Sequence, residues 1–117
     1  MITAIIPKLP FIGKNDTVDF YVNKLGFTLN SDFGDYFIVS KDTFELHLFS
    51  YPGLEPSKSD FMIYIRIENN IEIFYKKLQE AKVEIHPNGN LEKKPWGQIE
   101  FSILDPNGIL LTFGQSL

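Results

Sequence analysis

The chain has 117 residues, and its 15 Asp and Glu outnumber its 11 Lys and Arg to give a net charge of −4. At about 150 residues per domain, this length predicts a single domain over residues 1–117, and the 44% hydrophobic content excludes a disordered or fibrous chain. The acidic balance, with Arg66 as the only arginine, excludes the clustered basic face that nucleic acids require.

The sequence also argues against a membrane-spanning or secreted protein and against any function that depends on Cys. No apolar run is long enough for a membrane-spanning helix, and the first residues have neither the basic nor the long apolar region of a secretory signal. The sequence has no Cys, which excludes disulfides, thiolate metal sites and Cys nucleophiles. We therefore expect a cytoplasmic protein whose partner is a small molecule, with no nucleic acid and no membrane.

The first half of the chain predicts a strand, a helix and three more strands. Residues 4–6 enter a short strand that the following prolines confine to one end or edge of a sheet. Asp16 is the predicted N-cap of a helix that ends at Gly26. The apolar stripe of this helix has the i, i+3, i+4, i+7 spacing and consists of Val18, Tyr21, Val22 and Leu25. Three strands are predicted at residues 28–32, 36–40 and 43–49.

The second half of the chain repeats this order. A linker rich in Pro, Gly and Ser at about 51–59 separates module one, about 1–52, from module two, about 60–117. A strand at 61–67 precedes a helix capped by Asn69 or Asn70. Adding 53 to the four stripe positions of the first helix gives a second stripe, Ile71, Phe74, Tyr75 and Leu78. Strands are predicted at 83–86, 98–104 and 109–114, and the segment 86–95 is predicted to be a mobile, hydrophilic loop.

Two consecutive βαβββ modules follow from this repeat. The predicted fold is α+β, with curved mixed sheets around a concave cleft and the helices outside. Each module of about 55 residues is marginal alone, so the two must share a core.

The candidate site residues are aromatic and polar side chains predicted to line the cleft. On the strand at 98–104 the apolar side chains face the helix, so Gln98, Glu100 and Ser102 should face the cleft. Glu45 and His47 share one face of their strand. The aromatic candidates are Phe33 and Tyr36 beside a Gly-Asp turn, Tyr64 in a strand, and Trp96, the only tryptophan, in a loop.

Each candidate also has a structural interpretation that stays open. Trp96 could stack on a ligand or plug the core, and His47 could line a site or be a hydrogen-bonded strand histidine. Phe33 and Tyr36 could equally pack at a sheet edge. No Ser lies in a nucleophile elbow and no Gly-rich loop cradles a phosphate, so no catalytic residue and no cofactor is predicted.

Three segments together resemble the vicinal oxygen chelate superfamily of glyoxalases, bleomycin-resistance proteins and dioxygenases. They are residues 20–27 (FYVNKLGF), 44–49 (FELHLF) and 105–108 (DPNG), in the order of two βαβββ units. Short strings at 7–10, 51–56 and 96–97 are similar to the bleomycin-resistance branch. That resemblance implies a homodimer with a groove at its interface, which sequesters a bulky aromatic or cationic compound, such as a glycopeptide drug, without chemistry.

The same resemblance leaves an enzyme as the alternative. The superfamily's enzymes hold a divalent metal through His, Gln and Glu side chains on the first and last strands of each unit, and act for example as glyoxalase-like isomerases or thiol transferases. Here only Glu45 and His47 are ligand types at these positions, and both lie on one strand. We therefore expect no metal site, and a binding protein rather than an enzyme.

Overall fold

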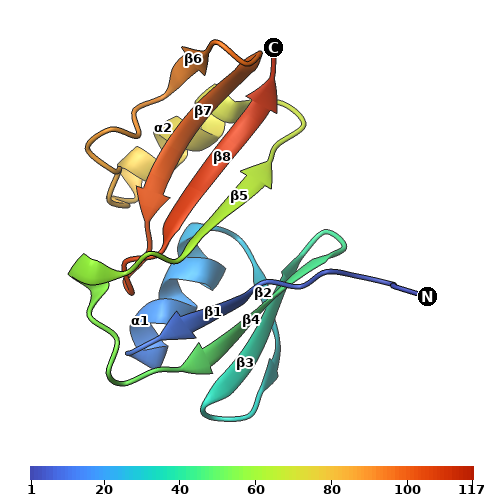
Figure 1. The fold of residues 1–117 in the computed structure, drawn as a ribbon, viewed down its shortest axis with the longest axis vertical. Coiled ribbons are helices and arrows are strands. Elements are labelled where there is room, and N and C mark those ends of the chain that lie inside the picture. Colours follow the sequence, from blue (N-terminus) through green and yellow to red (C-terminus); the bar gives the residue numbers. More distant parts are fainter.

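The computed structural model describes all 117 residues and contains two βαβββ modules. In Figure 1 the two modules lie one above the other, with a short 3-10 helix in the connection between them. The first module comprises β1 (Lys8–Phe11), α1 (Lys14–Val18), the π-helix η1 (Asp19–Lys24), β2 (Thr28–Asp32), β3 (Tyr36–Lys41) and β4 (Phe44–Ser50). After η2 (Pro56–Lys58), the second comprises β5 (Met62–Arg66), α2 (Ile71–Glu80), β6 (Glu92–Lys94), β7 (Gln98–Leu104) and β8 (Leu110–Ser116).

The two sheets have the same topology. Their strand orders are β1-β4-β3-β2 and β5-β8-β7-β6. In each sheet the first strand pairs in parallel with the last strand of its module, and the remaining pairs are antiparallel. The predicted α+β fold of two βαβββ modules with mixed sheets is therefore confirmed. No helix of the structure has the length and apolar character needed to cross a membrane.

The helical stripes predicted from the sequence do face the core. Tyr21 and Leu25 are buried under the first sheet, and Ile71 and Leu78 under the second. Phe74 and Tyr75 of α2 pack on Phe101 of β7 with ring centroids 5.8 and 5.0 Å apart. These contacts place α2 on the apolar face of its sheet, as the alternation along β7 predicts.

The predicted start of the first strand is wrong. Residues 4–6 are not in a strand, and β1 begins at Lys8, where its backbone pairs with β4 from His47 onward. Pro7 has no N–H to donate, although its carbonyl accepts from His47 N at 3.0 Å. Figure 1 shows the N-terminal residues extending away from the body of the molecule, and Met1, Ile2 and Ile5 are almost fully exposed.

The predicted cap of the first helix is wrong, whereas that of α2 is right in position but not in its hydrogen bond. The first helix begins after Gly13, which makes no side-chain cap, and Asp16 lies in the first turn instead. Asn70 occupies the N-cap position of α2 in a left-handed conformation, but its side chain caps nothing. The N–H of Ile71 instead donates to Gln115 Oε1 of β8 at 3.0 Å, so a distant residue replaces the expected local cap.

The segment between α2 and β7 is also different. Residues 83–86 were predicted to form a strand, but only Ile85 makes a single bridge, with Ile103. Part of the predicted loop 86–95 is instead the short edge strand β6, paired with β7 from Glu92 to Lys94. β6 is an edge strand that is held by backbone hydrogen bonds to β7 alone. Its three residues are all charged, so the sequence has no apolar alternation there that would indicate a strand.

A buried polar network joins the turn at 105–108 to the helix of the first module. Tyr21 Oη donates to Asp105 Oδ2 at 2.7 Å, and the backbone N–H groups of Asn107 and Ile109 donate to Asp105 Oδ1 at 2.8 and 2.9 Å. The Asn107 side chain donates to Thr17 Oγ1 at 3.1 Å and accepts from Ile12 N at 2.9 Å. We call Thr17, Tyr21, Asp105 and Asn107 the joint, because they connect the two modules across more than 80 residues of sequence.

Burial sets the charge state of the joint. Desolvation raises the pKa of Tyr21 well above 10.0, and the neighbouring Asp105 raises it further, so Tyr21 remains a hydrogen-bond donor. Desolvation also raises the pKa of Asp105 above 3.8, although its hydrogen bonds from Tyr21 and the backbone act in the opposite direction. Both groups therefore hold their protons more tightly here than in water.

Candidate functional site

The polar face of the second sheet lies opposite α2. On β7, Phe101 and Ile103 are buried on the helix side, while Glu100 and Ser102 alternate onto the other face. The register places Tyr64 of β5 and Ser102 on either side of Thr112 of β8. The Ser102 and Thr112 hydroxyl oxygens are 2.8 Å apart and share a hydrogen bond. This face therefore has a polar floor, built from three neighbouring strands.

Glu100 connects two aromatic side chains on this face. Its Oε2 accepts hydrogen bonds from Tyr64 Oη at 2.8 Å and from Trp96 Nε1 at 2.9 Å. Glu100 is only 7% exposed, whereas Tyr64 is 47% and Trp96 63% exposed. Partial burial and the carboxyl neighbour raise the pKa of Tyr64 above 10.0, which keeps its hydroxyl protonated. We call Tyr64, Trp96 and Glu100 the indole cluster. The large exposure of Trp96 rules out a plug over the core.

Two glycines shape the indole cluster. Gly97 has a φ of 80° in the turn of the β6–β7 hairpin, a conformation that places Trp96 at the tip. Gly114 of β8 leaves the space in which Tyr64 crosses the strand, because a Cβ there would lie 1.8 Å from Tyr64 Oη and 3.3 Å from Glu100 Cγ. The predicted set omitted Gly114, although a glycine inside a strand pattern is a signal of close approach.

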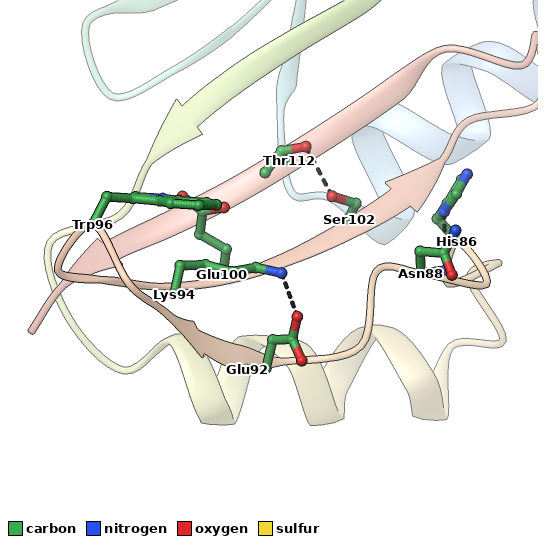
Figure 2. A network of polar contacts seen from close by, with 8 residues as sticks. All are labelled: His86, Asn88, Glu92, Lys94, Trp96, Glu100, Ser102 and Thr112. Atoms are coloured by element: carbon green, nitrogen blue, oxygen red, sulfur yellow. Dashed lines mark hydrogen bonds and ion pairs between the residues drawn. The ribbon is translucent and has the colours of Figure 1, made fainter.

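A cavity of about 160 Å³ opens beside the indole cluster. Figure 2 shows the indole of Trp96 beside the carboxyl group of Glu100, with Ser102 and Thr112 farther along the same face. Lys94 also lines the cavity, and its ammonium group is ion-paired with Glu92. The other lining residues are Asn88, Gly89, Asn90 and Phe101. Of these lining residues, the predicted site set contained Trp96, Glu100 and Ser102.

A larger cavity, of about 470 Å³, lies in the connection between the modules. Its lining residues run from Tyr51 to Phe61 and include the exposed ion pair of Glu55 with Lys58 at 3.1 Å. It contains none of the predicted site residues and no buried polar side chain. Specific binding depends on buried, positioned polar side chains more than on the volume of a cavity. The smaller cavity, which Glu100 lines, is therefore the better candidate site.

The polar face of the first sheet holds a second group of predicted residues. The Tyr36 hydroxyl lies 2.6 Å from His47 Nδ1, and His47 Nε2 lies 3.2 Å from Glu45 Oε1. Both contacts are satisfied when Nε2–H donates to Glu45 and Nδ1 accepts from Tyr36. The ammonium group of Lys8 lies 5.6 Å from the centroid of the Tyr36 ring, a cation–π distance. His47 is thus a strand histidine with both ring nitrogens in use.

The nine predicted residues are not brought together in one chain. Tyr36, Glu45 and His47 lie on the first sheet, whereas the indole cluster, Gln98 and Ser102 belong to the second. Phe33 is exposed in the β2–β3 turn, where its backbone N–H donates to the Tyr36 carbonyl at 2.8 Å, but its side chain makes no ring contact with either group. The Gln98 side chain donates to Ser116 Oγ at 3.2 Å, and its buried Oε1 has no partner.

The donor set does not fit the metal centre of the superfamily's enzymes. The first and last strands of the two modules pair Lys8 with His47 and Tyr64 with Thr112. Among these four side chains only His47 is an ordinary ligand for a divalent cation. Across the whole structure, no three His, Cys, Asp or Glu side chains lie close enough together to hold a metal ion.

Known proteins resemble this chain over nearly its full length. A bleomycin resistance protein from Klebsiella pneumoniae is 28% identical over 115 residues, covering 94% of this chain and 90% of its own. A bleomycin resistance protein from Geobacillus stearothermophilus is 24% identical, covering 96% of each chain.

The structural likeness is equally extensive. A bleomycin-binding protein solved in complex with bleomycin superposes with a TM-score of 0.85 at 26% identity, covering 99% of this chain and 100% of its own. A family model matches residues 15–113, a range that includes α2 and all four residues of the joint. The chain therefore belongs to the glyoxalase/bleomycin resistance protein/dioxygenase superfamily.

Proposed function

We propose that this protein binds a bulky aromatic and cationic compound of the bleomycin type and sequesters it without altering it. The relatives described above are bleomycin resistance and bleomycin-binding proteins, and their likeness covers almost the whole of this chain. The residues of this chain do not provide the metal ligands that a metal-dependent enzyme of the superfamily needs, which favours ligand binding over catalysis.

The observation that carries this proposal is the indole cluster. The indole of Trp96 is mostly exposed yet tethered through Nε1 to a buried carboxyl group. A flat, fixed aromatic surface stacks on heteroaromatic rings, and a neighbouring carboxylate attracts a cation. Ser102 and Thr112 add a polar floor for hydrogen bonds. Of the predicted site residues, Glu100, Trp96, Tyr64 and Ser102 would bind the ligand from the second sheet.

The remaining predicted residues would act in a homodimer. Because one chain displays its two polar faces on separate sheets, a second copy would bring the face of Tyr36, Glu45 and His47 opposite an indole cluster. Phe33 and Gln98 would extend the walls of the two equivalent grooves. Exposed apolar side chains such as Ile2, Ile5 and Met62 suit such an interface, since a second copy would remove them from water.

Calorimetric titration with bleomycin tests the binding function. We expect one saturable site per chain, quenching of Trp96 fluorescence, and recovery of bleomycin of unchanged mass. Trp96→Ala should weaken binding by about tenfold through loss of stacking. The matched control is Ile73→Ala, because Ile73 is also exposed (67%) but lies on α2, behind the sheet. No binding, a modified drug, or equal affinity in Trp96→Ala contradicts the proposal.

Mixing two variants tests the shared groove. If each groove takes one face from each copy, Trp96→Ala and His47→Ala chains form a mixed dimer with one groove free of both substitutions. The mixture should therefore recover tight bleomycin sites that neither variant has alone. If the mixture binds no better than the average of its parts, each site is complete within a single chain.

A further inference from the structure

The two carboxyl oxygens of Glu100 have different surroundings. Oε2 accepts from both Tyr64 and Trp96, whereas no group of the chain donates to Oε1. Gln98 Oε1 is the only fully buried side-chain oxygen or nitrogen without a partner, so Glu100 Oε1 is not completely buried although its residue is only 7% exposed. Glu100 lines the cavity beside Trp96, and Oε1 is the carboxyl oxygen that keeps its hydrogen-bonding capacity for an occupant.

No basic side chain of the protein forms an ion pair with Glu100. Its carboxyl group makes no ion pair, and the nearest lining cation, Lys94, is paired with Glu92 instead. The guanidinium of Arg66 lies beside Tyr64, 5.6 Å from its ring centroid, and acts on the Tyr64 hydroxyl without forming an ion pair with Glu100. A nearly buried carboxylate that has hydrogen bonds but no ion-pair partner attracts a cation from outside.

The other oxygen restrains the indole. Trp96 lies at the tip of a hairpin, where an exposed side chain is otherwise free to change rotamer. The hydrogen bond from Trp96 Nε1 to Glu100 Oε2 fixes the indole, and the hydrogen bond from Tyr64 fixes the carboxyl group in turn. Tyr64 can reach this position because Gly114 has no Cβ. A surface ordered before binding loses less conformational freedom when a ligand arrives.

We propose that Glu100 has two roles: its Oε2 fixes the indole of Trp96, and its Oε1 receives a protonated amine or amidine that the ligand carries beside a flat ring. Tyr64 and Gly114 are positioning residues that act through Glu100. The role of Oε1 rests on the proposed binding function, whereas the restraint of the indole does not.

The restraint is measured without any ligand. Trp96 is the only tryptophan, so time-resolved fluorescence anisotropy reports its motion alone. The fast local decay should grow at least twofold in Glu100→Leu and increase in Tyr64→Phe and Gly114→Ala. It should stay near wild type in Glu100→Gln, which keeps an acceptor oxygen, and in Lys93→Ala, a control on the same hairpin. Equal local motion in Glu100→Leu and wild type overturns the restraint, and folding of each variant is checked by circular dichroism.

A pair of probes of matched shape tests the open oxygen. Benzamidine has a flat ring with a cationic amidine, and benzamide is its neutral counterpart. Benzamidine should shift the Trp96 Nε1–H resonance in a saturable manner, at least fivefold more tightly than benzamide, and Glu100→Gln should abolish that preference. Equal binding of both probes, or no saturable shift with benzamidine, overturns the role of Oε1. Failure of bleomycin to bind would instead overturn the proposed function and leave the anisotropy result in place.

Discussion

Two tyrosine–carboxylate pairs occur in this molecule with almost the same geometry. Tyr21 donates to Asp105 at 2.7 Å in the joint, and Tyr64 donates to Glu100 at 2.8 Å on the polar face. In the first pair both residues are buried and every carboxyl oxygen is used within the chain. In the second, the tyrosine is half exposed, a third residue shares the carboxyl oxygen, and the other oxygen is open.

The difference between these pairs lies in their surroundings. A closed pair whose hydrogen bonds are all satisfied contributes to the stability of the fold, since breaking it leaves buried groups without partners. A pair with an open oxygen and an exposed ring can instead interact with a molecule from solution. The joint should therefore respond to substitution through stability, and the indole cluster through binding.

Removing the carboxylate of the joint should have the largest effect on stability. Asp105→Ala leaves the Tyr21 hydroxyl and the N–H groups of Asn107 and Ile109 buried without an acceptor. We expect a loss of about 3–5 kcal/mol in the free energy of unfolding, measured by urea denaturation. Asp35→Ala is the control, because Asp35 is exposed and its side chain makes no hydrogen bond. A loss as small as that of the control would refute the structural role of the joint.

The next largest effect should be a difference between the two tyrosine hydroxyls in their contribution to the free energy of unfolding. Tyr21→Phe leaves Asp105 Oδ2 buried without a donor and should lower the free energy of unfolding by about 1–3 kcal/mol. Tyr64→Phe removes a half-exposed hydroxyl that water replaces, so the loss should stay below about 1 kcal/mol. Equal losses in the two variants would erase the distinction between the pairs.

The pH dependence of stability sharpens the comparison further. Because burial raises the pKa of Asp105 above 3.8, the folded state binds this proton more tightly than the unfolded state does. The contribution of Asp105 is therefore most favourable below 3.8 and declines as the pH rises through the raised pKa. We expect the difference in free energy of unfolding between wild type and Asp105→Asn to fall over that range. A difference that grows with pH would mean that Asp105 is stabilised in its charged form.

The smallest effect is expected at the rim of the cavity. Lys94→Met removes the ion pair with Glu92, whose carboxyl side chain is 58% exposed. Exposed ion pairs contribute little because water and salt screen them, so the free energy of unfolding should change by less than about 0.5 kcal/mol. Thermal unfolding at low and high salt measures this, and a change above about 1 kcal/mol would place Lys94 among the structural residues.

Much of the fold could be predicted because it depends on local periodicity. The stripe that runs from Val18 to Leu25 repeats 53 residues later from Ile71 to Leu78, and the structure buries Tyr21, Leu25, Ile71 and Leu78. β6 and the real start of β1 were missed, since edge strands are set by backbone pairing with distant residues. The cap of α2 was missed for the same reason, because Gln115 reaches Ile71 across 44 residues.

The site was predictable in its composition but not in its arrangement. Alternation along β7 placed Glu100 and Ser102 on the face away from the helix, as the structure has them. Alternation cannot show that Glu100 bonds both Tyr64 and Trp96, because these contacts depend on how three strands and a hairpin meet. It also cannot show that the first-sheet residues lie apart from the second-sheet residues within one chain.

The joint has a consequence for how relatives of this chain are recognised. The phrases that make the sequence look familiar, FYVNKLGF and DPNG, contain Tyr21, Asp105 and Asn107, which hold the halves of the scaffold together. Trp96, by contrast, lies outside both phrases, at the tip of the β6–β7 hairpin. A resemblance carried by these two phrases therefore reports the scaffold, and it predicts the fold of this chain more directly than the ligand that the chain binds.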